Sequence, residues 1–529
     1  MKGWLHKMEE KTLPGQPLIW WIKAFAMALL PLICCLVSCA VQGKSMGDIY
    51  LPTNDWNDEL FYFKQVEATV AKGYPIGYFG YNESHALKLS LGPWSPMLVW
   101  PWVLWGLIFG WNLMTPVWCN LFLMSLAIFL FVMLVKPDNK QLGILAVLYC
   151  LFPLFTRYIF SAMPETICFS MLIVFSGLAV NYLKFRRSNG KLVLLFALSA
   201  LMTLMRPYLL LFMLLPAFLW VMKSRKWWSV VGSLGVMAAT FGIYAVMIYY
   251  FTPEYLTPIY STEWVDVFLE EGLFPGIKFM LGTIWHRSYE FVARIYEAFR
   301  SGLAEGVFFV AFTVVLILLL WETVRAFMKK RENDWIIFGH AALSLIGMLA
   351  ALLLMYGMKD GSKHLLSFVV LGIFLISIME TKYFAKTAII GVMLVYFFFI
   401  RADSLYEYRI PFATPEKVAS MEYWDRVFEE EMVLNHEKVP SFDNTVIWVL
   451  TDRKVGEKHE LLTEWQPLYF IPEGMGINCC YSSYVQENAG QLKSRYVGTR
   501  SEGHVDLACR EAGYEEIGRR DGFVVYKTK

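Results

Sequence analysis

Residues 18–40, LIWWIKAFAMALLPLICCLVSCA, decide the class of fold, because they form an apolar run long enough to cross a bilayer as a helix. The run is longer than the apolar core of a typical signal peptide, and the acidic Glu9 and Glu10 dilute the basic start of the chain. We therefore expect a helix that is retained. Small residues at Ser38 and Ala40 leave cleavage as the alternative.

Comparable apolar runs recur as far as Ile400 in a chain of 529 residues, of which 57% are hydrophobic and 17% charged. Such a composition lies outside the range of soluble proteins and predicts an all-α polytopic membrane protein. The formal net charge of +2 is too small to indicate a nucleic-acid partner. Basic residues gather instead in short connections between the apolar runs, and such connections accumulate on the cytoplasmic side.

About eleven crossings satisfy this charge bias in a plasma membrane, with the N-terminus in the cytoplasm and the C-terminus outside. They are expected near 18–40, 116–135, 141–160, 166–183, 191–205, 208–222, 229–251, 306–325, 335–357, 365–379 and 384–401. The two short segments beside Arg206-Pro207 could instead form one bent helix, but the cations of 325–331 would then lie outside. The Trp-rich stretch 95–111 is predicted to be a juxtamembrane or re-entrant element.

These crossings divide the chain into a transmembrane domain, 1–403, and a small extracytoplasmic α/β domain, 404–529. The transmembrane domain has two large outer loops, 41–115 and 252–305. In the second, Phe291, Ile295 and Phe299 recur at helical spacing, so this segment is expected to lie flat at the interface. The strand-like NTVIWVLTD (444–452) and the turn signal Asp521-Gly522 indicate a sheet in the C-terminal domain.

The first outer loop carries the acidic and aromatic stretch DIYLPTNDWNDELFYFKQVE (48–67) at the edge of the bilayer. Partial desolvation there raises the pKa of a carboxyl group toward the range of a general base. Asp58 and Glu59 are the first candidates for this role, and Asp55 is the second. A solvated loop, or an acidic cap on the helix that follows, is the structural alternative.

Other ionisable residues are predicted on the same outer face, namely Glu165, Arg206, Lys359, Lys363 and His364. Cations at this depth would stabilise an anion, and a lipid phosphate is the anion most available there. Structural alternatives exist for each: Glu165 would favour a helix dipole, and Arg206 would snorkel to the interface.

A divalent cation could bind Glu83 and His85 in the first outer loop. Two ligands do not make a site, so we assign no metal residues and no certain cofactor.

This layout resembles the GT-C superfamily of membrane glycosyltransferases, which take a sugar from a polyprenyl phosphate carrier. The resemblance is carried by Asp58-Glu59 in NDELFYF, the Trp-rich stretch 95–111, Glu165 in MPET, Arg206 in LMRPYLL, and Lys363-His364. It covers roughly residues 18–401. The chain departs from the family in having Glu in place of Asp at 165 and Lys-His where the family often has Arg, which leaves these two roles less supported than that of the first loop.

The resemblance implies an inverting transfer of a sugar from a polyprenyl-phosphate-linked donor to an extracytoplasmic glycan, lipid or protein acceptor, with Asp58 as base. Asp55, Glu165, Arg206, Lys359, Lys363 and His364 would bind substrate. A polytopic transporter or lipid flippase for a cell-envelope glycolipid is the alternative. Transporters place ionisable groups near the bilayer midplane, however, and His340 is the main such group here.

Overall fold

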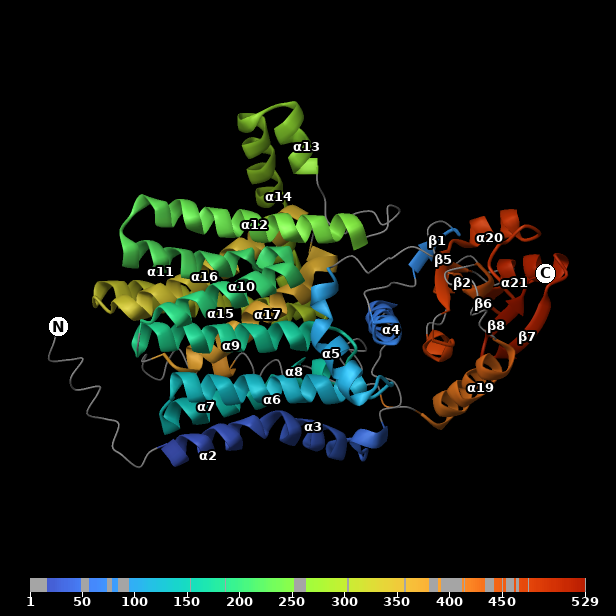
Figure 1. Cartoon of the computed structure of the whole chain (residues 1–529), viewed down its shortest axis with the longest axis horizontal. Coiled ribbons are helices and arrows are strands. Elements are labelled where there is room, and N and C mark those ends of the chain that lie inside the picture. The colour runs from blue at the N-terminus through green and yellow to red at the C-terminus, as the bar shows by residue number, and fades with distance from the viewer. Residues whose placement is uncertain are drawn as a thin grey trace.

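The computed structural model is a helical bundle joined at one end to a small α/β domain (Figure 1). It describes residues 17–48, 57–73, 79–83, 95–152, 154–185, 187–251, 263–301, 304–355, 358–379, 389–391, 412, 414–432, 442–449, 451–452, 461–462, 466–473 and 475–528.

Apolar helices make up the bundle, as the recurrent apolar runs predict. Within the described ranges, seven helical stretches are long and apolar enough to cross a membrane: Leu18–Val41, Thr115–Val135, Glu165–Lys184, Pro207–Ser224, Trp227–Tyr250, Phe309–Met328 and Glu332–Met355. They correspond to α2 (Pro17–Ala28) with α3 (Leu30–Val41), α6 (Thr115–Val135), α9 (Glu165–Lys184), η3 (Pro207–Met213) with α11 (Leu214–Ser224), α12 (Trp227–Phe251), α15 (Ala304–Met328) and α16 (Glu332–Met355). The chain is therefore a polytopic membrane protein.

The remaining expected crossings are shorter or interrupted. α10 (Asn189–Met205) and α17 (Met358–Ser377) coincide with two of them, and their apolar portions are shorter than 18 residues. The run 141–160 is not one helix, because it divides into α7 (Asn139–Cys150) and α8 (Leu154–Ile159). The crossing expected at 384–401 lies almost entirely outside the described residues.

The Trp-rich stretch after the first outer loop forms η2 (Pro96–Leu98) and α5 (Trp100–Phe109). α5 has only 10 residues, which is too short to cross a bilayer. It packs beside α6, where Trp102 is fully buried. This agrees with the expected juxtamembrane element.

The C-terminal domain contains α19 (Pro415–Glu431), α20 (Ser482–Asn488) and α21 (His504–Glu511) around a sheet of six strands. Its order is β1-β5-β2-β6-β8-β7, built from β1 (Phe79–Tyr81), β5 (Gly476–Cys480), β2 (Thr445–Val449), β6 (Tyr496–Arg500), β8 (Phe523–Lys527) and β7 (Glu515–Arg520). The expected hairpin turn at Asp521-Gly522 is present, with both residues in the left-handed conformation, φ 49° and 78°.

One strand of this sheet comes from the first outer loop. β1 pairs in parallel with β5, and Phe79 lies opposite Ile477. The first outer loop and the C-terminal domain therefore lie on the same side of the membrane, which the expected topology requires. The sheet thus extends beyond the expected domain range 404–529, whose boundary near 403 falls outside the described residues.

The acidic stretch of the first outer loop becomes α4 (Asn57–Lys72), which lies between the bundle and the C-terminal domain (Figure 1). Leu60 and Phe63 face the C-terminal domain and are buried with Tyr469 and Ile471. Tyr62 and Val66 face the bundle and belong to its core. Both apolar faces of α4 are therefore covered.

Candidate functional site

The first turn of α4 carries the two expected acids, and the fold separates their environments. Glu59 is fully buried, whereas Asp58 is partly exposed at the start of the helix. Glu59 pairs with Arg157 of α8 at 3.3 Å and accepts a hydrogen bond from Ser161. A buried carboxylate held in this way fixes the first turn of α4. Of the two acids, only Asp58 is thus accessible to solvent.

The connection between α8 and α9 is fixed by an amide inside the bundle. Asn120 of α6 donates through Nδ2 to the carbonyl oxygen of Ser161 at 2.8 Å, and to those of Tyr158 and Ile159 at 3.3 Å. Trp102 of α5 donates to Oδ1 of Asn120 at 2.9 Å. The juxtamembrane helix thereby stabilises the loop that holds Glu59 and leads into Glu165.

Glu165 and Arg206, which the sequence places in different loops, form one buried ion pair. Glu165 is the first residue of α9 and Arg206 follows the last residue of α10, and their Oε1 and Nη2 atoms are 2.7 Å apart. The exposed fractions of the two side chains are 0% and 1%. The second carboxylate oxygen of Glu165, Oε2, is buried and has no hydrogen-bond partner within the described part of the chain. This acceptor would suit a hydroxyl group or a cation.

The ion pair continues into α17 through a tyrosine. Arg206 donates through Nη1 to the hydroxyl of Tyr208 at 3.0 Å, and that hydroxyl lies 3.1 Å from Nδ1 of the buried His364. Glu165, Arg206, Tyr208 and His364 thus form one continuous polar network that joins α9, the end of α10, η3 and α17. His364 is held by this network instead of standing alone.

Tyr62 connects α4 to this network. Its side chain is buried on the bundle side of the helix. Burial, together with the negative charges of Asp58 and Glu165, raises the pKa of Tyr62 well above its ordinary value, while Arg206 acts in the opposite direction. The charges of Asp58, Glu165 and Arg206 therefore all act on the same buried tyrosine. The acids of the first loop and the cation between α10 and η3 therefore converge at one end of the bundle.

The other expected residues take different positions. Asp55 and His85 lie outside the described residues. Lys359 and Lys363 are in the first turns of α17, close in sequence to His364, and the orientation of their side chains is not described.

Glu83 is drawn into the C-terminal domain. Its carboxylate accepts bonds from the backbone N–H groups of Lys493 and Ser494 at 2.9 and 2.6 Å and from the hydroxyl of Tyr484 at 3.2 Å. These hydrogen bonds attach Glu83, and with it the end of β1, to the C-terminal domain. No cluster of three or more metal-ligating side chains occurs among the described residues.

The sequence analysis missed four members of the site: Arg157, Ser161, Tyr62 and Tyr208. A signal existed for Arg157, because a lone arginine inside the apolar run 141–160 requires a buried partner. Asn120 gave a similar signal in the run 116–135. Tyr62 and Tyr208 gave none, because an aromatic residue beside a charge is common in any membrane protein.

Comparison with known proteins found similarity among solved structures. No protein-family model matches the sequence, and no curated protein sequence matches it. An oligosaccharyltransferase of Archaeoglobus fulgidus, solved with a tethered acceptor peptide, is similar at 12% identity and a TM-score of 0.49 over 97% of this chain and 74% of that one. ArnT from Cupriavidus metallidurans, solved in the apo state and with undecaprenyl phosphate, is similar at 12% identity, with TM-scores of 0.44 and 0.42 over 96% of this chain and 97% of that one.

Proposed function

We propose that this protein is an integral membrane glycosyltransferase that moves a sugar from a polyprenyl-phosphate carrier to an extracytoplasmic acceptor, with inversion at the anomeric carbon. Asp58 acts as the general base. One observation carries the proposal: Glu165 and Arg206 form a buried ion pair at 2.7 Å, and α4, which carries Asp58 in its first turn, buries Tyr62 in the same bundle core, where the charges of all three residues act on it. A carboxylate and a cation at one end of the bundle match the two charges that such a transfer develops.

In this reaction Asp58 takes the proton of an acceptor hydroxyl, and the freed oxygen attacks the anomeric carbon. The bond from that carbon to the phosphate oxygen breaks, and its electron pair leaves with the polyprenyl phosphate. A phosphate leaves as a stable anion, so no general acid is required. The energetic task is to stabilise the anion, which we assign to Arg206 and the cations Lys359 and Lys363 of α17.

The remaining site residues hold these groups in place. Glu59, bound to Arg157 and Ser161, is a positioning residue for Asp58. Glu165 and Tyr208 orient the guanidinium group of Arg206, and His364 supports Tyr208. The free oxygen of Glu165 is available to a sugar hydroxyl of the donor.

The decisive experiment replaces Asp58 by Asn in cells that lack the wild-type gene. Asn keeps the shape of the side chain and removes its basicity, so transfer should fall by about a hundredfold or more. Mass spectrometry of extracted lipids should show the unused lipid-linked sugar accumulating to the same level as in a strain that lacks the gene. Asp55→Asn is the matched control and should restore most of the transfer.

The outcomes separate the possible bases. If Asp58→Asn restored transfer and Asp55→Asn did not, Asp55 would be the base and the reaction would stand. If both variants restored transfer fully, the glycosyltransferase proposal would lose its main support.

The phosphate-binding role is tested best at Lys363, because Arg206 is also needed by Glu165. Lys363→Gln should weaken donor use by about 10- to 150-fold, the effect of losing a charge-assisted contact of about 1.5–3 kcal/mol. A donor-concentration series on purified protein measures this change. Unchanged kinetics would make Lys363 an interface anchor.

A transporter or flippase is less well supported by the placement of charge. Among the described bundle residues, ion pairs gather at the two ends. Glu165–Arg206 lies at one end, and Lys184–Asp334 and Arg331–Asp334, at 3.1 and 2.8 Å, lie at the other. Transporters need ionisable groups near the midplane. His340 is half-buried, lies 3.3 Å from the carbonyl oxygen of Leu211, and forms no ion pair with any described residue.

A further inference from the structure

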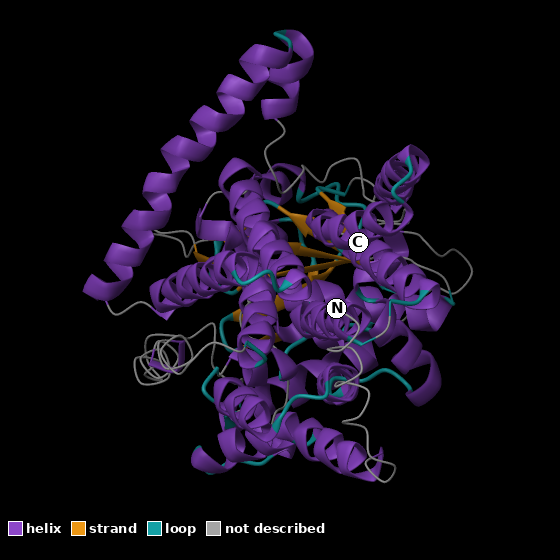
Figure 2. Ribbon diagram, turned by 90° about the vertical axis from the view of Figure 1, so that its left-hand side faces the viewer, coloured by secondary structure: helices purple, strands orange, loops and turns teal. Residues whose placement is uncertain are grey.

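The second outer loop forms a helical hairpin that the proposed reaction does not use. It consists of α13 (Glu263–Glu270) and α14 (Leu273–Ser301), joined by a turn in which Gly272 has φ 95°. Phe268 packs directly onto Gly276, where an added Cβ would lie 2.4 Å from the phenyl ring. We call this hairpin the arm. α14 runs along the side of the bundle and across the direction of the spanning helices (Figures 1 and 2).

One face of α14 attaches the arm to the bundle. Ile284, Phe291 and Ile295 pack against the bundle core, and the rings of Phe291 and Phe309 are 5.3 Å apart. The helical spacing of Phe291 and Ile295, from which an interfacial segment is expected, therefore marks the face of α14 that packs on the bundle. Arg287 donates to the carbonyl oxygens of Leu353 and Leu354, at 3.0 and 3.1 Å, in the last turn of α16.

A second face of α14 is apolar and exposed. Its residues recur at intervals of three, four or seven, which places them on one side of a helix: Phe274, Leu281, Trp285, Tyr289, Val292 and Tyr296. Their exposed fractions run from 57% for Leu281 to 82% for Phe274 and Trp285. In water such a surface would be unfavourable, because roughly 25 cal/mol is lost for each Å² of apolar area left exposed.

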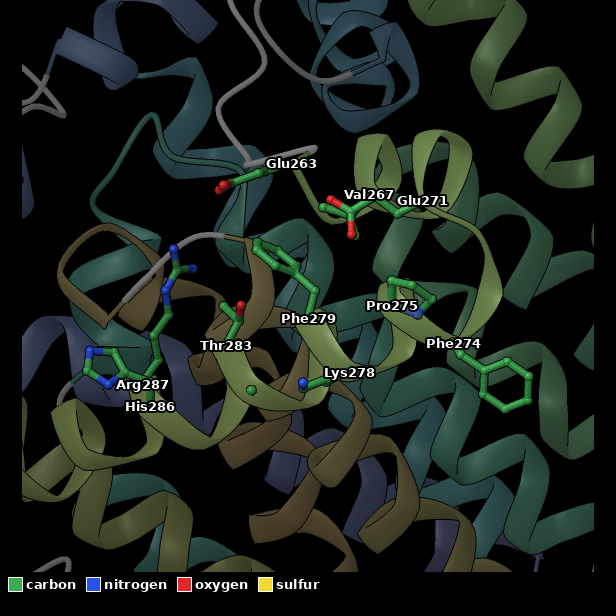
Figure 3. A pocket seen from close by; sticks show the side chains of 11 residues that line it. Glu263, Val267, Glu271, Phe274, Pro275, Lys278, Phe279, Thr283, His286 and Arg287 are labelled. Carbon is green, nitrogen blue, oxygen red and sulfur yellow. The ribbon is translucent and has the colours of Figure 1, made fainter.

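The third side of α14 borders a groove of about 1130 Å³ between the two helices, which is lined by charged side chains together with apolar ones such as Pro275 and Phe279 (Figure 3). Charged residues of both signs line the groove, with Glu263 and Glu271 on the side of α13 and Lys278, His286 and Arg287 on α14. A helix with adjoining protein-facing, apolar and polar faces is typical of an element that lies in the plane of a membrane interface. Trp and Tyr on the apolar face are the aromatic residues that favour this depth.

We propose that the arm lies in the bilayer interface, with its apolar face in the acyl chains and its groove at the level of the lipid headgroups. The occupant of the apolar face is therefore lipid. α14 packs on the spanning helix α15, which exposes apolar side chains of its own, among them Ile317 and Leu320. Arg287 fixes the depth, because it binds the end of α16 that leads into α17 and His364. The leaflet is thus the one beside the candidate site.

Nitroxide scanning of the full-length protein in phosphatidylcholine liposomes tests this position. Trp285→Cys places a label on the apolar face, and His286→Cys, one residue further, places a matched label on the polar face. Cys34 and Cys150, the native thiols that are not buried, are first replaced by Ala. Power-saturation spectroscopy then compares collisions with oxygen, which enters the acyl region, and with a water-soluble nickel chelate.

We expect the label at 285 to collide mainly with oxygen and the label at 286 mainly with the nickel chelate. Equal access of nickel to both labels would place the arm in water and overturn the proposal. A label at 285 that is shielded from both reagents would show that protein, such as a second copy of the chain, covers the face. That result would also overturn it. Both positions are exposed, so neither variant needs repacking to fold.

Discussion

The helices of the two outer loops differ in what covers them. α4 of the first loop is enclosed between the bundle and the C-terminal domain, and the exposed fraction of Phe63 is 2%. Its ring lies 5.1 Å from Tyr469 and 5.2 Å from Trp111. α14 of the second loop attaches along one face only, and Trp285 is 82% exposed. The loop that carries Asp58 is therefore fixed from both sides, while the helix of the other loop keeps one apolar face exposed.

This contrast shows what the C-terminal domain contributes. The domain binds the first loop at two places. At α4, Lys64 donates to the carbonyl oxygen of Ile471 at 2.9 Å. At β1, Glu83 accepts a hydrogen bond from the backbone N–H of Ser494. A general base must keep its geometry within a fraction of an ångström, and a loop attached at a single point would not hold it. The domain thus acts on the proposed site without having to supply a reacting group.

The largest expected difference between the loops comes from removing one apolar side chain from each. Phe63→Ala should destabilise the protein by about 3–5 kcal/mol, because it leaves a cavity between α4 and the C-terminal domain. Leu281→Ala on the exposed face of α14 should cost less than about 0.5 kcal/mol in detergent. Thermal unfolding of the two purified variants measures the contrast. Equal shifts in Tm would mean that α4 is not enclosed.

A smaller effect is expected from Lys64→Met. Lys64 is buried and also pairs with Glu67 at 2.8 Å, and burial of Glu67 already raises the pKa of that carboxyl group. Losing these charge-assisted contacts should cost about 1.5–3 kcal/mol and reduce transfer, since α4 would be released at one contact. Lys278→Met on the exposed side of α14 is the control. Full stability of Lys64→Met would show that this contact does not hold the loop.

Glu83→Gln should have a weaker and more local effect, of roughly 1 kcal/mol. The amide can still accept hydrogen bonds but lacks the charge that strengthens them. Hydrogen exchange followed by mass spectrometry should show faster exchange in β1 and β5 and little change in α14. Glu290→Gln, on the exposed polar face of α14, serves as the control. Unchanged exchange in β1 would show that Glu83 does not attach the first loop to the C-terminal domain.

The smallest effect concerns the opposite edge of the same sheet. Burial raises the pKa of Asp506, but hydrogen bonds from Arg519 and Tyr526 outweigh it and lower the value to about 2. Because the folded pKa is below the ordinary value, this contribution is complete above about pH 4 and is lost as the pH falls toward 2. Asp506→Asn should cost less than about 1 kcal/mol at pH 7 and flatten the acid dependence of Tm. An unchanged acid dependence would assign the effect to other carboxyl groups.

The helices could be predicted from the sequence because their signal is local. A long apolar run in lipid has to form a helix, since its backbone groups find no other partners. The break between α7 and α8 was missed although Pro153, which lies between them in the sequence, interrupts helical hydrogen bonding. The pairing of Arg157 in that run with Glu59 from a distant segment, in contrast, has no local signal. A hydropathy pattern contains no information about such a partner.

The site was predictable as a set of residues but not as an arrangement. Asp58 and Glu59 are neighbours with the same charge, and only the fold makes one buried and the other partly exposed. Glu165 and Arg206 could each be named from the sequence, but their ion pair depends on how α9 and α10 pack. β1 has three residues and no pattern of its own, so its place in the C-terminal sheet could not be foreseen.

The parallel pairing of β1 with β5 also has a consequence for how the protein is made. Phe79 has to wait for its partner Ile477, which is added to the growing chain much later. Contacts between such distant residues form late, and an unpaired strand edge is prone to wrong partners in the meantime. The first outer loop would acquire its final shape only after β5 had reached the same side of the membrane. A chain that still lacked β5 would therefore hold its acidic residues in a loop that could not yet act.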